Sequence, residues 1–149
     1  RLERVKTRSA AEVFVDYAHT DDALANVLST VREFAKGKVW AVFGAGGDRD
    51  TRKRPLMGAA AARFADHLVV TSDNPRSEDP RAIIDQIVAG IPSGTDAVVE
   101  PDRRAAIHLA LERAAPGDVV VVCGKGHETT QTIGSRVLHF DDRETCAAF

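Results

Sequence analysis

Short runs of β-branched residues alternate along the chain with segments of helical periodicity, and this alternation constrains the fold most strongly. Five strands are expected, at residues 13–15, 38–43, 67–71, 96–100 and 118–123. Four helices are expected between them, at residues 21–35, 54–64, 80–89 and 102–114. Strands that alternate with helices indicate a parallel sheet covered on both faces. We therefore expect a Rossmann-like α/β fold with a mostly parallel sheet and helices on both faces.

The last part of the chain leaves this alternation. Two short strand patterns, at residues 130–133 and 136–140, are joined through Gly134 and Ser135, which predicts a C-terminal β-hairpin. Residues 141–149 are expected to begin a last helix. Because the sequence has no internal repeat and no Pro/Gly/Ser-rich linker, we expect one domain over residues 1–149.

Charge and cysteine content exclude several classes of function. The 20 Lys and Arg residues nearly balance the 22 Asp and Glu residues, so no overall basic excess points to nucleic acid or to an anionic membrane surface. No apolar run approaches the roughly 18 residues that a membrane span needs. Cys123 and Cys146 form neither a disulfide framework nor a repeated metal-ligand spacing, which suits a reducing, cytoplasmic setting.

Four unusual segments directly follow expected strands, at residues 16–19, 44–50, 72–76 and 124–128. In an open parallel sheet, ligands bind beyond the carboxyl ends of the strands. These four segments are therefore the first candidates for a binding site.

The segments at residues 44–50 and 72–76 each carry an arginine. The glycines at positions 44, 46 and 47 allow a close backbone approach to a ligand, and Arg49 offers a planar fork for a carboxylate or phosphate. Arg76 would project from the same rim. Two guanidinium groups there could hold two carboxylates, or both ends of one dicarboxylate. Taken singly, the glycine-rich segment is more typical of an ordinary turn with a solvated arginine, and residues 73–76 are consistent with a surface loop before a helix.

The segment at residues 124–128 contains Gly-Lys but lacks the earlier glycine of a Walker A loop, so a phosphate-binding loop is rejected. Glu128 is a candidate receptor for an ammonium group, although a lone acidic residue is usually solvated. Cys123 and His127 lack a second pair of metal ligands. A buried thiol and a structural histidine are the better interpretation.

The segment at residues 16–19 could contact a nucleotide, through hydrogen bonds to ribose hydroxyls and through aromatic packing of Tyr17. Alternatively, Asp16 satisfies backbone donors in the turn, and His19 caps or packs. A haloacid-type nucleophilic aspartate is disfavoured because Ala18 stands where a second Asp would be needed. We expect no catalytic residue in this chain.

Taken together, residues 15–20, 42–50, 53–57, 73–76 and 124–128 resemble, in order and spacing, the C-terminal domain of the Mur ligases that add meso-diaminopimelate to UDP-N-acetylmuramoyl-L-alanyl-D-glutamate. The resemblance extends over nearly the whole chain. It implies a three-domain enzyme whose first domain holds the UDP-sugar peptide and whose central domain binds ATP and Mg²⁺. Both of those domains would lie outside this chain, which resembles the last domain. In the family, the incoming amine attacks an acyl phosphate that is formed from ATP. Because this chain lacks a phosphate-binding loop and candidate Mg²⁺ ligands, the isolated domain is expected to be inactive.

The resemblance also implies roles for individual residues. Arg76 would take the distal carboxylate of diaminopimelate with help from Asn74, and Arg49 would take the second carboxylate. The carbonyl of Gly124 and the side chain of Glu128 would receive the distal ammonium. The residues expected to bind diaminopimelate are Arg49, Asp73, Asn74, Pro75, Arg76, Gly124 and Glu128.

A second group of residues matches the family segments near the nucleotide. Arg1 and Glu3 resemble the remains of a hinge motif that brings an arginine near the phosphates. The family usually has proline where this chain has Asp21, and both residues suit the first turn of a helix. No metal ligand is expected in this chain. The residues expected near the nucleotide are Arg1, Asp16, Tyr17 and His19.

Two other readings stay open. A sister ligase could add lysine or reuse cell-wall peptides, although lysine has no second carboxylate to pair with Arg76. A stand-alone module could keep the sheet and one anion site without catalysis. On the favoured reading the substrates are meso-diaminopimelate, ATP and the UDP-N-acetylmuramoyl dipeptide, and the protein is a monomer; Lys125 and His127 receive no role.

Overall fold

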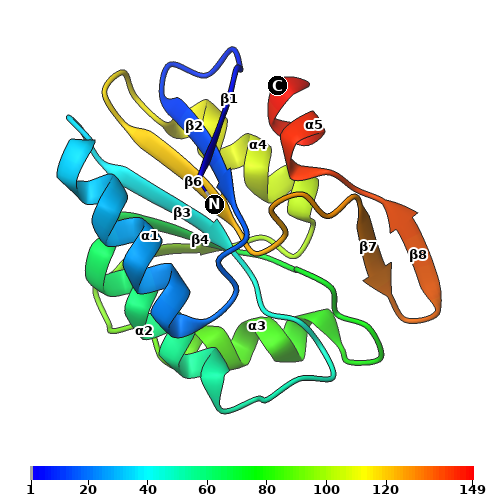
Figure 1. Ribbon diagram of the computed structural model, residues 1–149. Coiled ribbons are helices and arrows are strands. Elements are labelled where there is room, and N and C mark those ends of the chain that lie inside the picture. Colours follow the sequence, from blue (N-terminus) through cyan, green and yellow to red (C-terminus); the bar gives the residue numbers. More distant parts are fainter. Residues whose placement is uncertain (1) are drawn as a thin grey trace.

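A six-stranded sheet with helices on both faces, followed by a separate two-stranded hairpin, makes up the computed structural model, which describes residues 2–149 (Figure 1). The order of strands in the large sheet is β1-β2-β6-β3-β4-β5. The strands are β1 (Glu3–Val5), β2 (Glu12–Asp16), β3 (Val39–Phe43), β4 (His67–Val70), β5 (Asp96–Val99), β6 (Val119–Cys123), β7 (Thr130–Ile133) and β8 (Arg136–His139). The helices are α1 (Asp21–Phe34), α2 (Lys53–Phe64), α3 (Pro80–Val88), α4 (Arg103–Arg113) and α5 (Asp142–Ala147).

Strands β2 to β6 are all parallel, as the sequence predicted, and β6 lies at the centre between β2 and β3. Val122 of β6 is level with Val15 on one side and Val42 on the other. Strand β1 was not expected. It pairs antiparallel with β2 and forms one edge of the sheet. The mostly parallel α/β fold and the C-terminal hairpin are confirmed.

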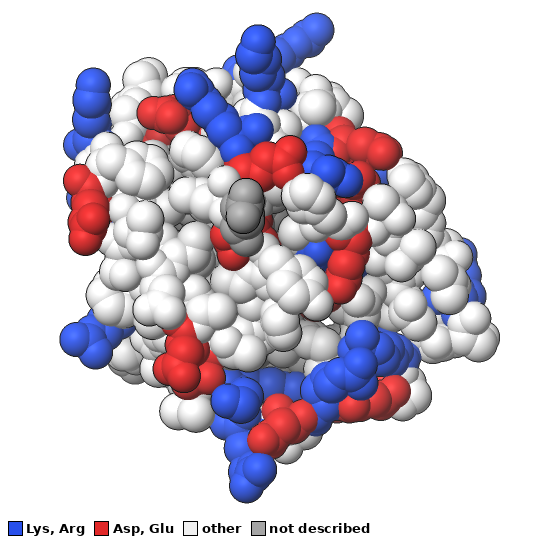
Figure 2. Space-filling view, viewed as in Figure 1, with Lys and Arg blue, Asp and Glu red and all other residues white. Residues whose placement is uncertain are grey.

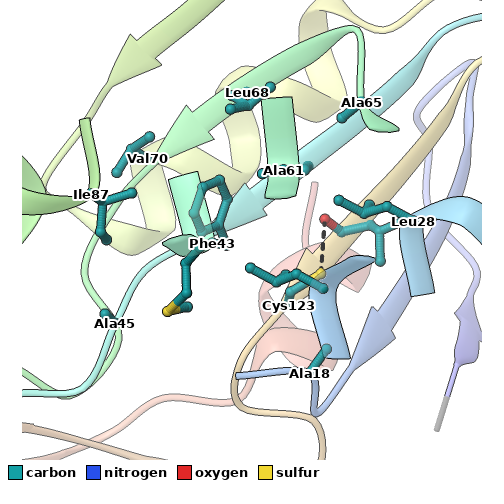
Figure 3. Packing of buried hydrophobic residues seen from close by; sticks show 14 of the residues in the cluster. Ala18, Leu28, Phe43, Ala45, Ala61, Ala65, Leu68, Val70, Ile87 and Cys123 are labelled. Carbon is teal, nitrogen blue, oxygen red and sulfur yellow. Dashed lines mark hydrogen bonds between the residues drawn. The ribbon is translucent and has the colours of Figure 1, made fainter. Parts of the chain in front are cut away.

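Alternating side chains of the central strands build two cores. On one face, Phe43, Val121 and their neighbours pack against α1, α2 and α3; Figure 3 shows Leu28, Ala61 and Ile87 converging on this layer. On the other face, Val42 and Val122 pack against α4 and α5. Because β3 and β6 are buried on both sides, their sequences are continuous apolar runs.

Helix starts follow the expected capping chemistry. Thr20 accepts a hydrogen bond from the backbone N–H of Ala23 at the start of α1, and Asp79 caps α3 with Pro80 in its first turn. Helix α2 begins at Lys53, one residue before the predicted start, and has no side-chain cap bond. Helix α4 begins one residue later than predicted, because Asp102 is its cap.

The surface bears charges of both signs. Figure 2 shows basic and acidic side chains next to one another around the edge of the face that it presents. Within residues 2–149, none of the helices combines the length and the apolar character needed to cross a membrane.

Candidate functional site

A pocket of about 320 Å³ lies beyond the carboxyl ends of the parallel strands. The loops that follow β2, β3, β4 and β6 all contribute to its wall, which is the arrangement that the sequence predicted for these four segments. The predicted site residues that line it are Tyr17, His19, Arg49, Asp73, Asn74, Arg76, Gly124 and Glu128. Pro75 and Asp16 do not line this pocket.

Arg76 is held in an unusual backbone conformation. Its φ angle is 53°, a left-handed value that costs energy for a residue with a Cβ. The hairpin stabilises it: the Arg76 N–H donates to the carbonyl of Thr132 at 3.0 Å, and Arg76 forms a bridge with Ile133. One guanidinium nitrogen donates to the carbonyl of Gly47 at 2.9 Å. The guanidinium group is therefore aimed at the pocket by backbone contacts.

The glycine-rich loop that carries Arg49 packs against the backbone of the Asn74 loop. Gly47 donates its N–H to the carbonyl of Asn74 at 2.8 Å. A Cβ on Gly47 would lie 1.8 Å from the carbonyl oxygen of Pro75, so only glycine fits there. This contact explains how Arg49 and Arg76 come to the same pocket from two loops.

Arg54, to which the sequence analysis gave no role, fixes the same loop from behind. Its side chain is 1% exposed and donates to Glu78 at 2.7 and 2.9 Å, to Gln86, and to the carbonyl of Gly46 at 3.0 Å. Hydrogen bonds from the Arg54 guanidinium and from the backbone N–H of Asp48 lower the pKa of Glu78 to about 2. This pair of a buried arginine and a partly exposed carboxylate anchors the start of α2 to the loop.

Asn74 and Glu128 both line the pocket and contact each other. The Asn74 amide donates to Glu128 Oε1 at 3.4 Å, and the Asn74 Oδ1 accepts from the backbone N–H of Thr132 at 2.9 Å. Lys125, fully buried, lies 3.5 Å from both acceptor oxygens. The residue left without a role is thus part of the wall's hydrogen-bond network.

Asp73 and Gly124 meet at the floor of the pocket. The backbone φ of Gly124 is 118°, and a Cβ there would lie 2.5 Å from the Asp73 carboxylate. Burial raises the pKa of Asp73, while the charges of Arg103 and Lys125 act in the opposite direction. The Asp73 carboxyl group therefore lies close against the Gly124 backbone, and both residues line the pocket.

A second buried arginine supports the floor from the opposite face of the sheet. Arg103, at the start of α4, pairs with Asp142 of α5 at 2.7 Å, and both side chains are fully buried. Its other donors bind the carbonyls of Ser72 and Cys123, the residues that precede Asp73 and Gly124. The interactions with Asp142 raise the pKa of Arg103 despite its burial. No local sequence pattern predicted this clamp.

The residues expected near a nucleotide are divided by the structure. Tyr17 and His19 line the pocket with their rings 4.6 Å apart, and Tyr17 is half exposed. Asp16 instead lines a separate hollow beside α1, and its carboxylate accepts from the Ala18 N–H at 2.8 Å. That bond is the turn-satisfying role that the sequence analysis left open. Arg1 lies outside the described residues.

Two smaller expectations can also be placed. Glu3 lies in β1, with its carboxylate 2.9 Å from His127 Nε2. Cys123 is buried at the end of β6, where desolvation raises its pKa. Over residues 2–149, no group of three or more His, Cys, Asp or Glu side chains is placed to hold a metal ion.

The chain matches known proteins over nearly all of its length. The family model described as the Mur ligase, glutamate ligase domain matches residues 1–126. Curated UDP-N-acetylmuramoyl-L-alanyl-D-glutamate–2,6-diaminopimelate ligases from Synechococcus elongatus and Thermosynechococcus vestitus are 57% and 56% identical over 97% of the chain. The chain spans 29% of the length of each of these relatives.

A solved structure of a ligase with the same name superimposes with a TM-score of 0.92 and 45% identity, covering 98% of this chain and 30% of that one. The sequence and the fold agree with the resemblance noted from the motifs alone. The chain therefore belongs to the Mur ligase family, as its glutamate ligase domain.

Proposed function

We propose that the chain is the C-terminal domain of an ATP-dependent ligase that adds meso-diaminopimelate to UDP-N-acetylmuramoyl-L-alanyl-D-glutamate in peptidoglycan synthesis. The observation that carries the proposal is one pocket that Arg49, Arg76 and Glu128 line together. The relatives that match 97% of the chain bear the name of this activity. The first two domains of such an enzyme would lie outside this chain.

The charge pattern of the pocket suits the shape of the amino acid. Diaminopimelate has a carboxylate and an amine at each end of a short aliphatic chain. Arg76 would pair with the distal carboxylate and Asn74 would donate to it, while Arg49 would pair with the other carboxylate. The distal ammonium would bind Glu128 and the carbonyl of Gly124. Between these ends, the apolar side chains of Ala45 and Met57 line the pocket, next to the ligand's methylene groups.

Asp73 and Pro75 contribute in different ways to the same motif. Asp73 adds a buried carboxyl beside Gly124 and would raise the preference for a cationic group. Pro75 faces away from the pocket, and its carbonyl lies against Gly47. Its role would be to fix the loop that presents Asn74 and Arg76.

ATP and Mg²⁺ would be bound mainly by the central domain. The exposed ring pair of Tyr17 and His19 offers a surface on which a nucleotide could stack and hydrogen-bond. The resemblance also assigns Arg1 and Asp16 to the nucleotide. Within residues 2–149 the carboxylates do not gather into a metal site, so the chemistry that Mg²⁺ supplies to phosphoryl transfer would come from outside this domain.

The test compares amino acids in the full-length ligase that contains this chain. With ATP and the UDP-N-acetylmuramoyl dipeptide present, meso-diaminopimelate should support phosphate release and L-lysine should not. The purified chain alone should unfold cooperatively on heating and release no phosphate above the blank. Equal use of lysine would overturn the choice of substrate, and ATP turnover by the chain alone would overturn the domain assignment.

A further inference from the structure

Lys125 is a fully buried lysine that lies behind two side chains of the pocket lining, those of Asn74 and Glu128. Its ammonium donates to the carbonyl of Thr130 and lies 3.5 Å from Asn74 Oδ1 and 3.5 Å from Glu128 Oε1. An ammonium has three N–H donors, so these three acceptors account for all of them. A buried charge without such partners would be strongly destabilising; here it is bonded to two of the side chains that face the ligand.

The ammonium is one of two donors that orient the Asn74 amide. Asn74 Oδ1 receives both Lys125 and the backbone N–H of Thr132. With the oxygen held by two donors, the amide nitrogen must point the other way, toward Glu128 at 3.4 Å. A reversed amide would place N–H groups against an ammonium and a backbone N–H. Lys125 and the Thr132 N–H therefore together fix the Asn74 amide with its nitrogen toward Glu128.

The same charge acts on two carboxyl groups. Glu128 is ion-paired with Lys125, and Asp73 is buried on the pocket floor within the influence of the same ammonium. Without Lys125, Asp73 and Glu128 would repel each other in a low-dielectric site. The ammonium offsets this repulsion and leaves Glu128 positioned beside Asn74 before any ligand binds.

We propose that Lys125 is a positioning residue that presets Asn74 and Glu128 for the distal end of the amino acid, where a carboxylate and an ammonium are recognised side by side. This inference rests on the proposed function and deepens it. The lysine of the Gly-Lys-Gly sequence is thus buried, and its ammonium contacts Asn74 and Glu128 from behind the pocket lining. Gly126, with φ of 54° and Tyr17 3.0 Å from the site of an added Cβ, lets the loop turn tightly after it.

The experiment measures steady-state kinetics of Lys125→Met in the full-length ligase, varying each of the three substrates in turn. Loss of hydrogen bonds to charged groups should raise KM for meso-diaminopimelate about 10- to 100-fold. The KM values for ATP and for the UDP-N-acetylmuramoyl dipeptide should stay within about twofold. Lys36→Met, at an exposed position after α1, is the matched control and should change none of the three. Equal rises in all three KM values, or no rise for meso-diaminopimelate, would overturn the inference.

A double-mutant cycle with Asn74→Ala separates positioning from general stability. If Lys125 acts through Asn74, adding Lys125→Met to Asn74→Ala should raise KM for the amino acid by much less than it does in the wild type. Full additivity would overturn the inference. Lys125→Gln, a smaller polar change, gives the same cycle if Lys125→Met does not fold. A wild-type enzyme that does not use meso-diaminopimelate would instead overturn the proposed function, and this is established before any variant is compared.

Discussion

Two pairs of arginines lie at the same rim of the sheet and differ in their bonding partners. Arg54 and Arg103 are at most 1% exposed, and each pairs with a carboxylate and with backbone carbonyls. Arg49 and Arg76 line the pocket, and their hydrogen bonds run to the neutral carbonyls of Asp48 and Gly47. Arg54 also reaches the pocket lining, but its charge is already paired.

The difference separates arginines that build the site from arginines that remain available to a ligand. A guanidinium that is paired with a buried carboxylate is electrostatically satisfied, and removing either partner leaves an isolated charge. A guanidinium that donates only to a neutral carbonyl is oriented, but no carboxylate offsets its positive charge. Substitutions in the first group should therefore affect folding, and substitutions in the second group should affect the choice of ligand.

The largest expected effect is on substrate choice. The wild-type site should reject lysine by as much as about 10⁴-fold, because a site built for a polar group penalises its absence. In the full-length ligase, Arg76→Ala should remove most of this discrimination between meso-diaminopimelate and lysine. The loss should come from weaker use of diaminopimelate. The measurement is kcat/KM for both amino acids.

Two further variants sharpen that result. Arg76→Lys should rescue little, since an ammonium cannot reproduce the two-pronged contact of a guanidinium. Arg49→Ala should weaken the use of both amino acids if Arg49 holds the carboxylate that they share. An unchanged ratio in Arg76→Ala would remove Arg76 from the recognition site and, with it, the distinction between the two pairs.

The next effect in size is on stability. Arg103→Ala should lower the free energy of unfolding of the chain by about 3–5 kcal/mol, because it leaves Asp142 as an uncompensated buried charge. Asp142→Ala should have a similar effect, and the double variant should be less destabilised than the sum of the two. Urea unfolding measures all three, with Arg76→Ala as the comparison. If Arg76→Ala destabilised the chain as much as Arg103→Ala, the two pairs would not differ in kind.

The fold could be predicted largely because its signals are local. Strands β3 and β6 are runs of buried residues, and the caps Thr20 and Asp79 act within their own first turns. Strand β1 was missed because three residues, Glu-Arg-Val, carry too little pattern, and because its pairing with β2 is decided by the edge of the sheet.

The candidate site was predictable only in part. The rule that loops meet beyond the carboxyl ends of parallel strands brought Arg49, Arg76 and Glu128 together correctly. Burial of charge has no comparable local signal. Arg103 pairs with Asp142, which is 39 residues away in the sequence. Nothing in the sequence around Lys125 indicates that its ammonium contacts Asn74. Such residues depend on contacts that only the folded chain brings together.

The smallest expected effect concerns the acid stability of the Arg54–Glu78 pair. The pKa of Glu78 falls from an ordinary 4.5 to about 2 when the chain folds, so the folded state binds fewer protons than the unfolded state between these values. The stabilisation is fully present above pH 4.5 and is lost as the pH falls toward about 2. Glu78→Gln should therefore make the unfolding free energy fall less steeply with acid in this range. The loss of unfolding free energy at neutral pH should be smaller than for Arg103→Ala, because Glu78 is partly exposed and the amide oxygen can still accept from Arg54.

The measurement is urea unfolding at a series of pH values, with Glu112→Gln, at an exposed position on α4, as the matched control. Identical slopes for Glu78→Gln and the wild type would show that the pair does not set the acid response, and would leave Arg54 bound chiefly by Gln86 and the carbonyl of Gly46.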